Sequence, residues 1–111
     1  MELVFKDNKL ARVLNDGTKM QAVYGSARAR LLRLRLAVLS AAANLAHVPV
    51  RPPDRCHLLS GDLAGRFAVD IVHPFRLVFE PKDNPPPKKR GGGVDLGLVT
   101  AIVILEVVDY H

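Results

Sequence analysis

The chain has 111 residues and a mass of 12.2 kDa, the size of a single domain. Because 49% of its residues are apolar and only 24% are charged, the composition excludes a largely disordered chain. Sixteen Lys and Arg against eleven Asp and Glu give a net charge of +5, which favours an anionic partner, either nucleic acid or an acidic protein.

A single cysteine, Cys56, excludes an intrachain disulfide. No charge-free apolar run approaches the ~18 residues that a membrane span needs, and the first six residues lack the pattern of a signal peptide. We therefore expect a cytoplasmic protein that has no membrane partner.

The N-terminal half predicts helices. Residues 3–5 favour a short strand, and residues 7–14 a helix that begins at an Asp or Asn cap. A second helical pattern starts at Thr18 and is interrupted by Gly25. The main helix is expected over residues 27–44, which contain no glycine or proline.

Two apolar stripes run along the main helix. One stripe should meet a sheet, and the other either packs on the preceding helix or remains available to a partner protein. Four arginines lie between or beside the stripes, where we expect a solvated face. The stripes are Leu32, Leu36, Leu39 and Ala43, and Leu31, Leu34 and Val38; the arginines are Arg28, Arg30, Arg33 and Arg35.

The C-terminal half predicts strands. After a proline-rich crossover, residues 55–60 and 66–72 read as a hairpin, and residues 75–80 as a third strand. Alternation in this third strand points Arg76 away from the apolar face. The last strand, residues 99–108, is apolar on both sides and therefore belongs inside the sheet.

Residues 81–97 contain four prolines, three consecutive glycines and the basic cluster Lys88-Lys89-Arg90, and we expect a long flexible loop. Its basic tip either contacts RNA or is a solvated excursion. Helices followed by antiparallel strands predict an α+β fold, one domain over residues 1–111, with the helices on one face of the sheet.

Polar side chains gather near the ends of the expected strands. Two imidazoles with pKa values near ~6.5 can serve as general base and acid, and arginines can bind a phosphate with two hydrogen bonds. This set is what metal-free RNA cleavage requires, although a lone histidine on a strand is more often structural. The residues are His57, Arg66, Arg76, Asp109, Tyr110 and His111.

Other chemistries fit less well. The four histidines and the cysteine show no close metal-ligand spacing, and neither glycine cluster matches a phosphate-binding loop. Cys56 and His57 are neighbours on a strand and so face opposite sides, which makes Cys56 a small buried residue rather than a nucleophile. We expect no metal and no cofactor.

Taken together, the segments resemble the RelE/ParE/HigB superfamily of bacterial toxins, specifically its HigB-like "killer protein" branch, whose members are encoded with an antitoxin. The likeness covers essentially the whole chain. It is carried by LVFKD at residues 3–7, RCHLLSGD at 55–62 with Gly65, HPFRLVFEP at 73–81, and VTA, ILE and VVDYH at 99–101, 104–106 and 107–111.

The resemblance implies a RelE-like, mostly antiparallel sheet with helices on one face and a basic active site on the other. It implies an endoribonuclease that cuts mRNA on the ribosome without a metal, is neutralised by an antitoxin with a helix-turn-helix domain, and reaches operator DNA only in complex with that antitoxin. Matched by position, the site residues are His57, Arg76 and the acid-base cluster Asp109, Tyr110 and His111, with Arg66 nearby.

Two positions depart from the HigB-like pattern. Ser60 stands where lysine is common, and Leu63 where arginine is frequent, so two cations that would help to hold RNA are missing. Two alternatives therefore remain open. One is a ParE-like inhibitor of DNA gyrase, and the other is a weakened toxin that acts as a co-repressor with its antitoxin.

Overall fold

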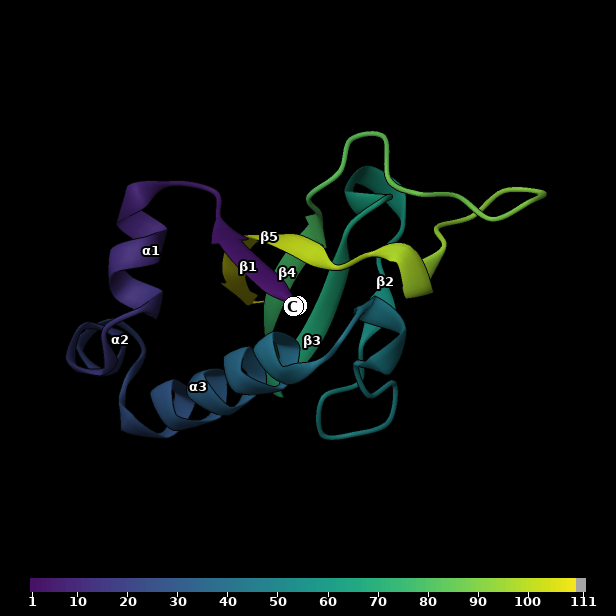
Figure 1. Cartoon of the computed structure of the whole chain (residues 1–111). Coiled ribbons are helices and arrows are strands. Elements are labelled where there is room, and N and C mark those ends of the chain that lie inside the picture. Colours follow the sequence, from purple (N-terminus) through teal and green to yellow (C-terminus); the bar gives the residue numbers. More distant parts are fainter. Residues whose placement is uncertain (110–111) are drawn as a thin grey trace.

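The computed structural model describes residues 1–109 and shows helices first and then a sheet, with the helices on one side of it (Figure 1). The helices are α1 (Asn8–Leu14), α2 (Gly17–Tyr24) and α3 (Ser26–Ala41), with short 3-10 turns η1 (Leu45–His47), η2 (Gly61–Leu63) and η3 (Leu96–Leu98). The strands are β1 (Glu2–Phe5), β2 (His57–Leu58), β3 (Phe67–Val72), β4 (Phe75–Pro81) and β5 (Ala101–Asp109). No helix in the described part of the chain is long and apolar enough to cross a membrane.

The sheet has the strand order β1-β5-β4-β3-β2. All neighbouring pairs are antiparallel except β1 and β5, which run parallel. The expected α+β fold is confirmed, and so is the position of the last strand inside the sheet. The parallel pairing of the first and last strands was not predicted.

The main core lies between the helices and one face of the sheet. Leu32 and Leu39 of α3 are fully buried there. The opposite face, here called the far face, has a smaller apolar cluster of Leu59, Ala68 and Val78. Side chains of β3 and β4 therefore alternate between a thick core and a thinner cluster, and a polar residue on the far face can remain accessible.

The helix starts follow the local sequence. Asp7 caps α1 by accepting a hydrogen bond from the Leu10 amide at 2.8 Å, and Asp16 caps α2 in the same way. Gly25, at φ +85°, separates α2 from α3 and is the residue at the N-cap of α3.

The expected C-terminal limit of the main helix at residue 44 is wrong. The helix ends at Ala41 because Ala42 is extended, with φ −66° and ψ 136°. The amino group of Met1 donates to the carbonyls of Ser40 and Ala42, so it satisfies groups that a longer helix would have bonded internally.

The expected strand over residues 55–60 is also too long, since β2 contains only His57 and Leu58. Arg55 has φ +47°, which breaks an extended chain, and η2 starts soon after Leu58. Residues 82–95 contain no helix or strand, apart from an isolated bridge between Lys88 and Val94.

The second apolar stripe of α3 fits neither expectation completely. Leu31 packs against the main core, whereas Leu34 is 48% exposed.

The prediction that the four arginines of the main helix form a solvated face is only partly correct. Arg30 and Arg33 are exposed, but Arg35 is buried, and the guanidinium carbon of Arg28 lies 4.2 Å above the ring of Phe75.

Candidate functional site

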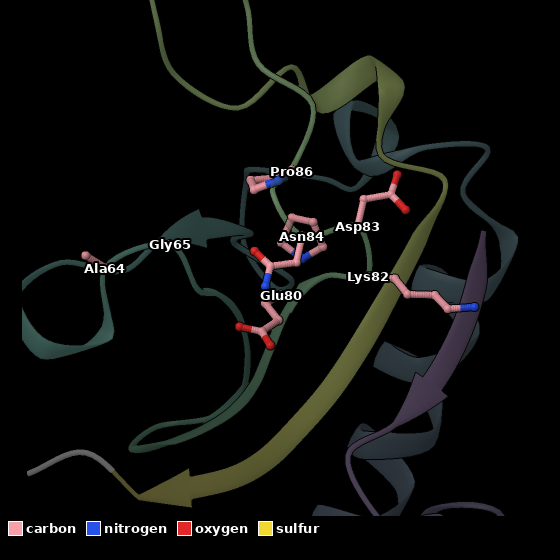
Figure 2. Close-up of a pocket in the computed structure, with 8 residues that line it drawn as sticks. Ala64, Gly65, Glu80, Lys82, Asp83, Asn84 and Pro86 are labelled. Carbon is pink, nitrogen blue, oxygen red and sulfur yellow. The ribbon is translucent and has the colours of Figure 1, made fainter.

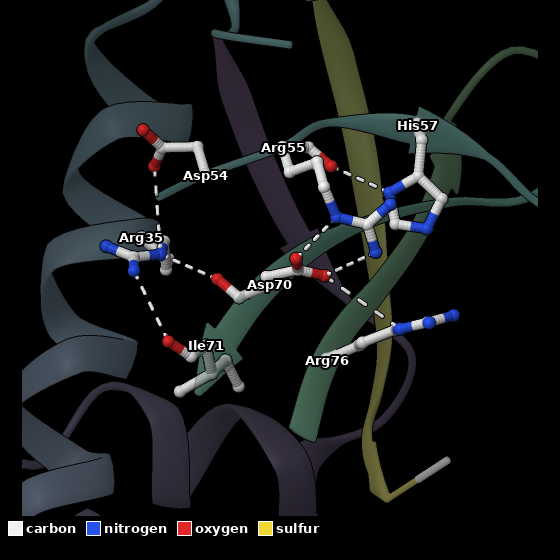
Figure 3. Close-up of polar contacts among 7 residues, drawn as sticks. All are labelled: Arg35, Asp54, Arg55, His57, Asp70, Ile71 and Arg76. Atoms are coloured by element: carbon white, nitrogen blue, oxygen red, sulfur yellow. Dashed lines mark hydrogen bonds and ion pairs between the residues drawn. The ribbon is translucent and has the colours of Figure 1, made fainter. Parts of the chain in front are cut away.

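An arginine–aspartate cluster, made of Arg55, Asp70 and Arg76, occupies the far face of the sheet (Figure 3). Pairing of β3 with β4 sets Asp70 directly opposite Arg76, and Arg76 Nε lies 3.9 Å from Asp70 Oδ1. Arg55 donates to the same carboxylate twice, with Nε 2.6 Å from Oδ2 and Nη2 3.1 Å from Oδ1. Two guanidinium groups thus converge on one carboxylate.

The backbone beneath the cluster is held by Arg35 of α3. Its Nε donates to the carbonyl of Asp70 at 2.6 Å and its Nη2 to that of Ile71 at 3.3 Å, where the β3–β4 register shifts. Asp54, also buried, lies 3.8 Å from the same guanidinium, and its carbonyl accepts from the Asp70 amide. A buried guanidinium therefore fixes the strand that presents the Asp70 carboxylate.

His57 lies on the same face, opposite Ala68 and two residues along β3 from Asp70. Its Nδ1 is 2.7 Å from the carbonyl oxygen of Arg55. Since a carbonyl oxygen can only accept, Nδ1 carries the hydrogen, and the lone pair of the neutral ring is on Nε2. This is the tautomer that a general base acting through Nε2 needs.

The two residues just before β2, Arg55 and Cys56, differ in charge near neutral pH. Hydrogen bonding to Asp70 raises the pKa of Arg55, so this group stays charged at every physiological pH. On the core side, burial, helped by Asp54, raises the pKa of Cys56 to about 11. The thiol is neutral near pH 7, which agrees with the interpretation of Cys56 as a packing residue rather than a nucleophile.

A small cavity of about 30 Å³ adjoins the cluster. It has room for about one water-sized group, such as an anionic oxygen. Besides the three cluster residues, its lining is His73, Pro74 and Phe75, from the connection between β3 and β4.

The structure brings together some of the predicted site residues. Arg76 and His57 share the far face. Arg66 immediately precedes β3 and by alternation shares that face, but it lies four residues from Asp70, about 13 Å along the strand, and is outside the cluster. Asp109 ends β5 opposite Phe75, next to the Arg76–Val108 pair. Tyr110 and His111 lie outside the described residues.

Sequence reasoning missed Arg35, Arg55 and Asp70. A two-residue connection at residues 73–74 would set Ile71 opposite Arg76, and Asp70 takes that place only because the β3–β4 register shifts between Asp70 and Val72. None of the three gave a local signal, since the register shift and the partners of Arg55 and Arg35 do not follow from neighbouring residues.

A separate, larger cavity of about 260 Å³ lies where β4 leaves the sheet (Figure 2). Glu80, Asp83 and Asn84 line it, whereas the side chain of Lys82 points toward β1 and pairs with Glu2 at 3.3 Å.

Among residues 1–109, no three His, Cys, Asp or Glu side chains gather as metal ligands would.

No protein-family model matches the sequence, and no curated protein matches it. Solved structures do match. A YoeB/ParE toxin from Agrobacterium tumefaciens is similar with a TM-score of 0.56 and 12% identity over the full length of both chains. A YoeB–YefM complex from Staphylococcus aureus is similar with a TM-score of 0.54 and 16% identity, over all of this chain and 97% of the other. The chain therefore has the fold of the YoeB/ParE toxins.

Proposed function

We propose that this protein is the toxin of a type II toxin–antitoxin system and a metal-independent, ribosome-dependent mRNA endoribonuclease of the HigB-like branch. One observation supports this most directly: two arginines converge beside an imidazole whose Nε2 bears the lone pair, on the sheet face that the helices leave uncovered. The shared fold with YoeB/ParE toxins agrees with it.

In the proposed reaction, His57 Nε2 removes the proton of a ribose 2′-hydroxyl, and the resulting oxygen attacks the adjacent phosphorus. The bond from phosphorus to the 5′-oxygen breaks, which leaves a 2′,3′-cyclic phosphate. Arg55 and Arg76 stabilise the additional negative charge of the phosphorane-like transition state, and Arg66 binds a neighbouring phosphate.

An acid must protonate the leaving 5′-oxygen. We assign this role to His111, with Tyr110 as the alternative and Asp109 as the group that orients them. The end of β5 runs beside Arg76, since Val108 is the pairing partner of Arg76. Arg55 adds a second cation beside Arg76, whereas Ser60, which replaces the lysine of the HigB-like pattern, lies nearer Arg66, whose carbonyl accepts from the Leu59 amide.

The proposed partner is a cognate antitoxin with a helix-turn-helix domain, through which the toxin reaches operator DNA. The S. aureus neighbour is itself a complex of YoeB with YefM. A net charge of +5 suits binding both to an acidic segment and to RNA.

The test is an in vitro translation reaction with a defined mRNA, read by primer extension. Wild-type protein should cut the mRNA only during translation, and His57→Gln should reduce the rate about 10²- to 10⁴-fold. His47→Gln, at an exposed histidine of η1, is the matched control and should leave the rate unchanged. Deletion of residues 110–111 should reduce cleavage as well.

Two sets of results would contradict this proposal, and each would support one of the alternatives. Intact mRNA together with inhibition of gyrase in a DNA supercoiling assay would support the ParE-like alternative. Intact mRNA, unaffected supercoiling and normal growth when the protein is overproduced without antitoxin would support the co-repressor.

A further inference from the structure

An apolar cavity of about 310 Å³ opens at the outer edge of β2. It lies between η1, the β2 edge and the loop that precedes η3, and Figure 1 shows this loop extending past β2. Its lining residues include Leu45, Val50, His57, Leu58, Phe67 and Lys89. His57 therefore belongs both to this cavity and to the proposed catalytic site.

Two of the lining side chains are unusually open to solvent. Val50 is 70% exposed and Leu58 is 58% exposed, although both are aliphatic. Exposed apolar side chains that gather around a hollow indicate a binding surface. The volume is at the small end of the range for ligand pockets, about 300–1,000 Å³, so it suits one flat ring system rather than a folded partner.

The charge at the cavity indicates the kind of ligand. The lining contains no Asp or Glu, and Lys89 is at its rim. The Lys89 amide donates to the Gly93 carbonyl at 2.9 Å and its carbonyl accepts from Gly92 at 3.0 Å, while Lys88 bridges to Val94. These bonds close the basic tip of the long loop on itself, and Lys89, Gly93 and Val94 of the tip line the cavity, where the lysine can meet a phosphate.

We propose that this cavity binds one nucleobase of single-stranded RNA, in the nucleotide next to the cleaved bond, and that Lys89 contacts the phosphate of that nucleotide. The proposal rests on the proposed ribonuclease function. An apolar hollow accepts the face of the base, as stacking surfaces do in proteins that bind single strands. Because His57 lines the cavity, the bound base and the reacting 2′-hydroxyl belong to the same or adjacent nucleotides.

The experiment measures binding of a fluorescent, non-cleavable 2′-O-methyl hexanucleotide by anisotropy, with oligonucleotides that are abasic at each position in turn. Wild-type protein should lose about 5- to 100-fold in affinity at one abasic position. Val50→Asp places a charge in the cavity and should weaken binding of the intact RNA similarly while abolishing the abasic effect. Val23→Asp, at a valine of α2 that is 59% exposed and does not line the cavity, is the matched control.

Lys89→Ala, compared with Lys19→Ala on α2, tests the phosphate contact independently. It should lower the salt dependence of binding by about one counterion, and it provides a second variant if Val50→Asp does not fold. Three results would overturn the inference: no abasic position lowers the affinity, Val50→Asp and Val23→Asp bind RNA with equal affinity, or Val50→Asp weakens binding of the antitoxin but not of RNA. If the protein binds RNA in a base-dependent way but does not cleave it, the proposed function is wrong and the cavity assignment stands. If Val50→Asp and Lys89→Ala cleave RNA at the wild-type rate, the cavity assignment is wrong and the proposed function stands.

Discussion

Arg55 holds both carboxylate oxygens of Asp70, at 2.6 and 3.1 Å, while Arg76 approaches the same carboxylate from the neighbouring strand at 3.9 Å. One negative charge is thus shared by two positive charges, and the cluster keeps a net positive charge. The carboxylate also sets the direction of both guanidinium groups. Asp70 therefore holds the arginines in place, and at the same time it competes with any phosphate for them.

Asp70→Asn keeps the size of the side chain and removes its charge. We expect tighter RNA binding and a steeper salt dependence, because both arginines become available to phosphates. We also expect slower cleavage, because the arginines lose the group that orients them. Binding at several salt concentrations and single-turnover cleavage rates check the two effects separately.

Asp83→Asn removes an exposed carboxylate of the loop after β4 and provides the control for the change in net charge. Equal changes in salt dependence for the two variants would show that only net charge matters and that the cluster has no special role.

Arg35→Met should destabilise the fold. The change leaves one buried and one partly buried carbonyl without their donor, and the buried carboxylate of Asp54 without a nearby cation. Removing one partner of a buried charged pair commonly costs about 3–5 kcal/mol. Urea denaturation should show this loss in the free energy of unfolding, whereas Arg30→Met, at an exposed position of the same helix, should stay within about 0.5 kcal/mol of wild type.

The thiol of Cys56 should make stability fall in alkaline solution. Burial raises its pKa in the folded state from 9.0 to about 11, so the folded chain holds this proton more tightly than the unfolded chain does. The stabilisation is complete below pH 9 and is lost as the pH rises toward about 11. Chemical denaturation between pH 8 and about 11 should show a smaller decline for Cys56→Ala than for wild type, and equal slopes would contradict the assignment.

Local sequence patterns predicted the elements whose causes are local. Asp7, within the expected Asp or Asn cap, caps α1 through a bond to an amide three residues later, and alternation in β4 correctly directed Arg76 away from the main core. The early end of α3 and the parallel β1–β5 pair depend on contacts between segments about 40 and 100 residues apart in the chain, which periodicity does not report.

The site was predicted less completely for a similar reason. An arginine in a helix rich in leucine and arginine normally suggests a solvated face, so burial of Arg35 depends on a strand bulge that no local pattern reveals. Asp70 alternates with Val69 and Ile71 and so looked like an ordinary solvent-facing strand position. Only its pairing with Arg76 shows that it belongs to a charged cluster.

A substitution at Arg55 should affect RNA cleavage without lowering the stability of the fold. Its φ of +47° is unfavourable for a side chain with a Cβ by about 1–3 kcal/mol, whereas its ion pair is 40% exposed at the arginine and contributes about 0–1 kcal/mol. Arg55→Gly should therefore leave the free energy of unfolding unchanged or slightly higher, since glycine adopts this backbone without strain. RNA cleavage should nevertheless fall about 10²- to 10³-fold, because one of the two cations that face the developing phosphate charge is gone. Arg51→Gly, in the exposed loop four residues earlier, controls for charge and for added chain flexibility. Parallel losses of stability and activity in Arg55→Gly would mean that this arginine serves the fold alone.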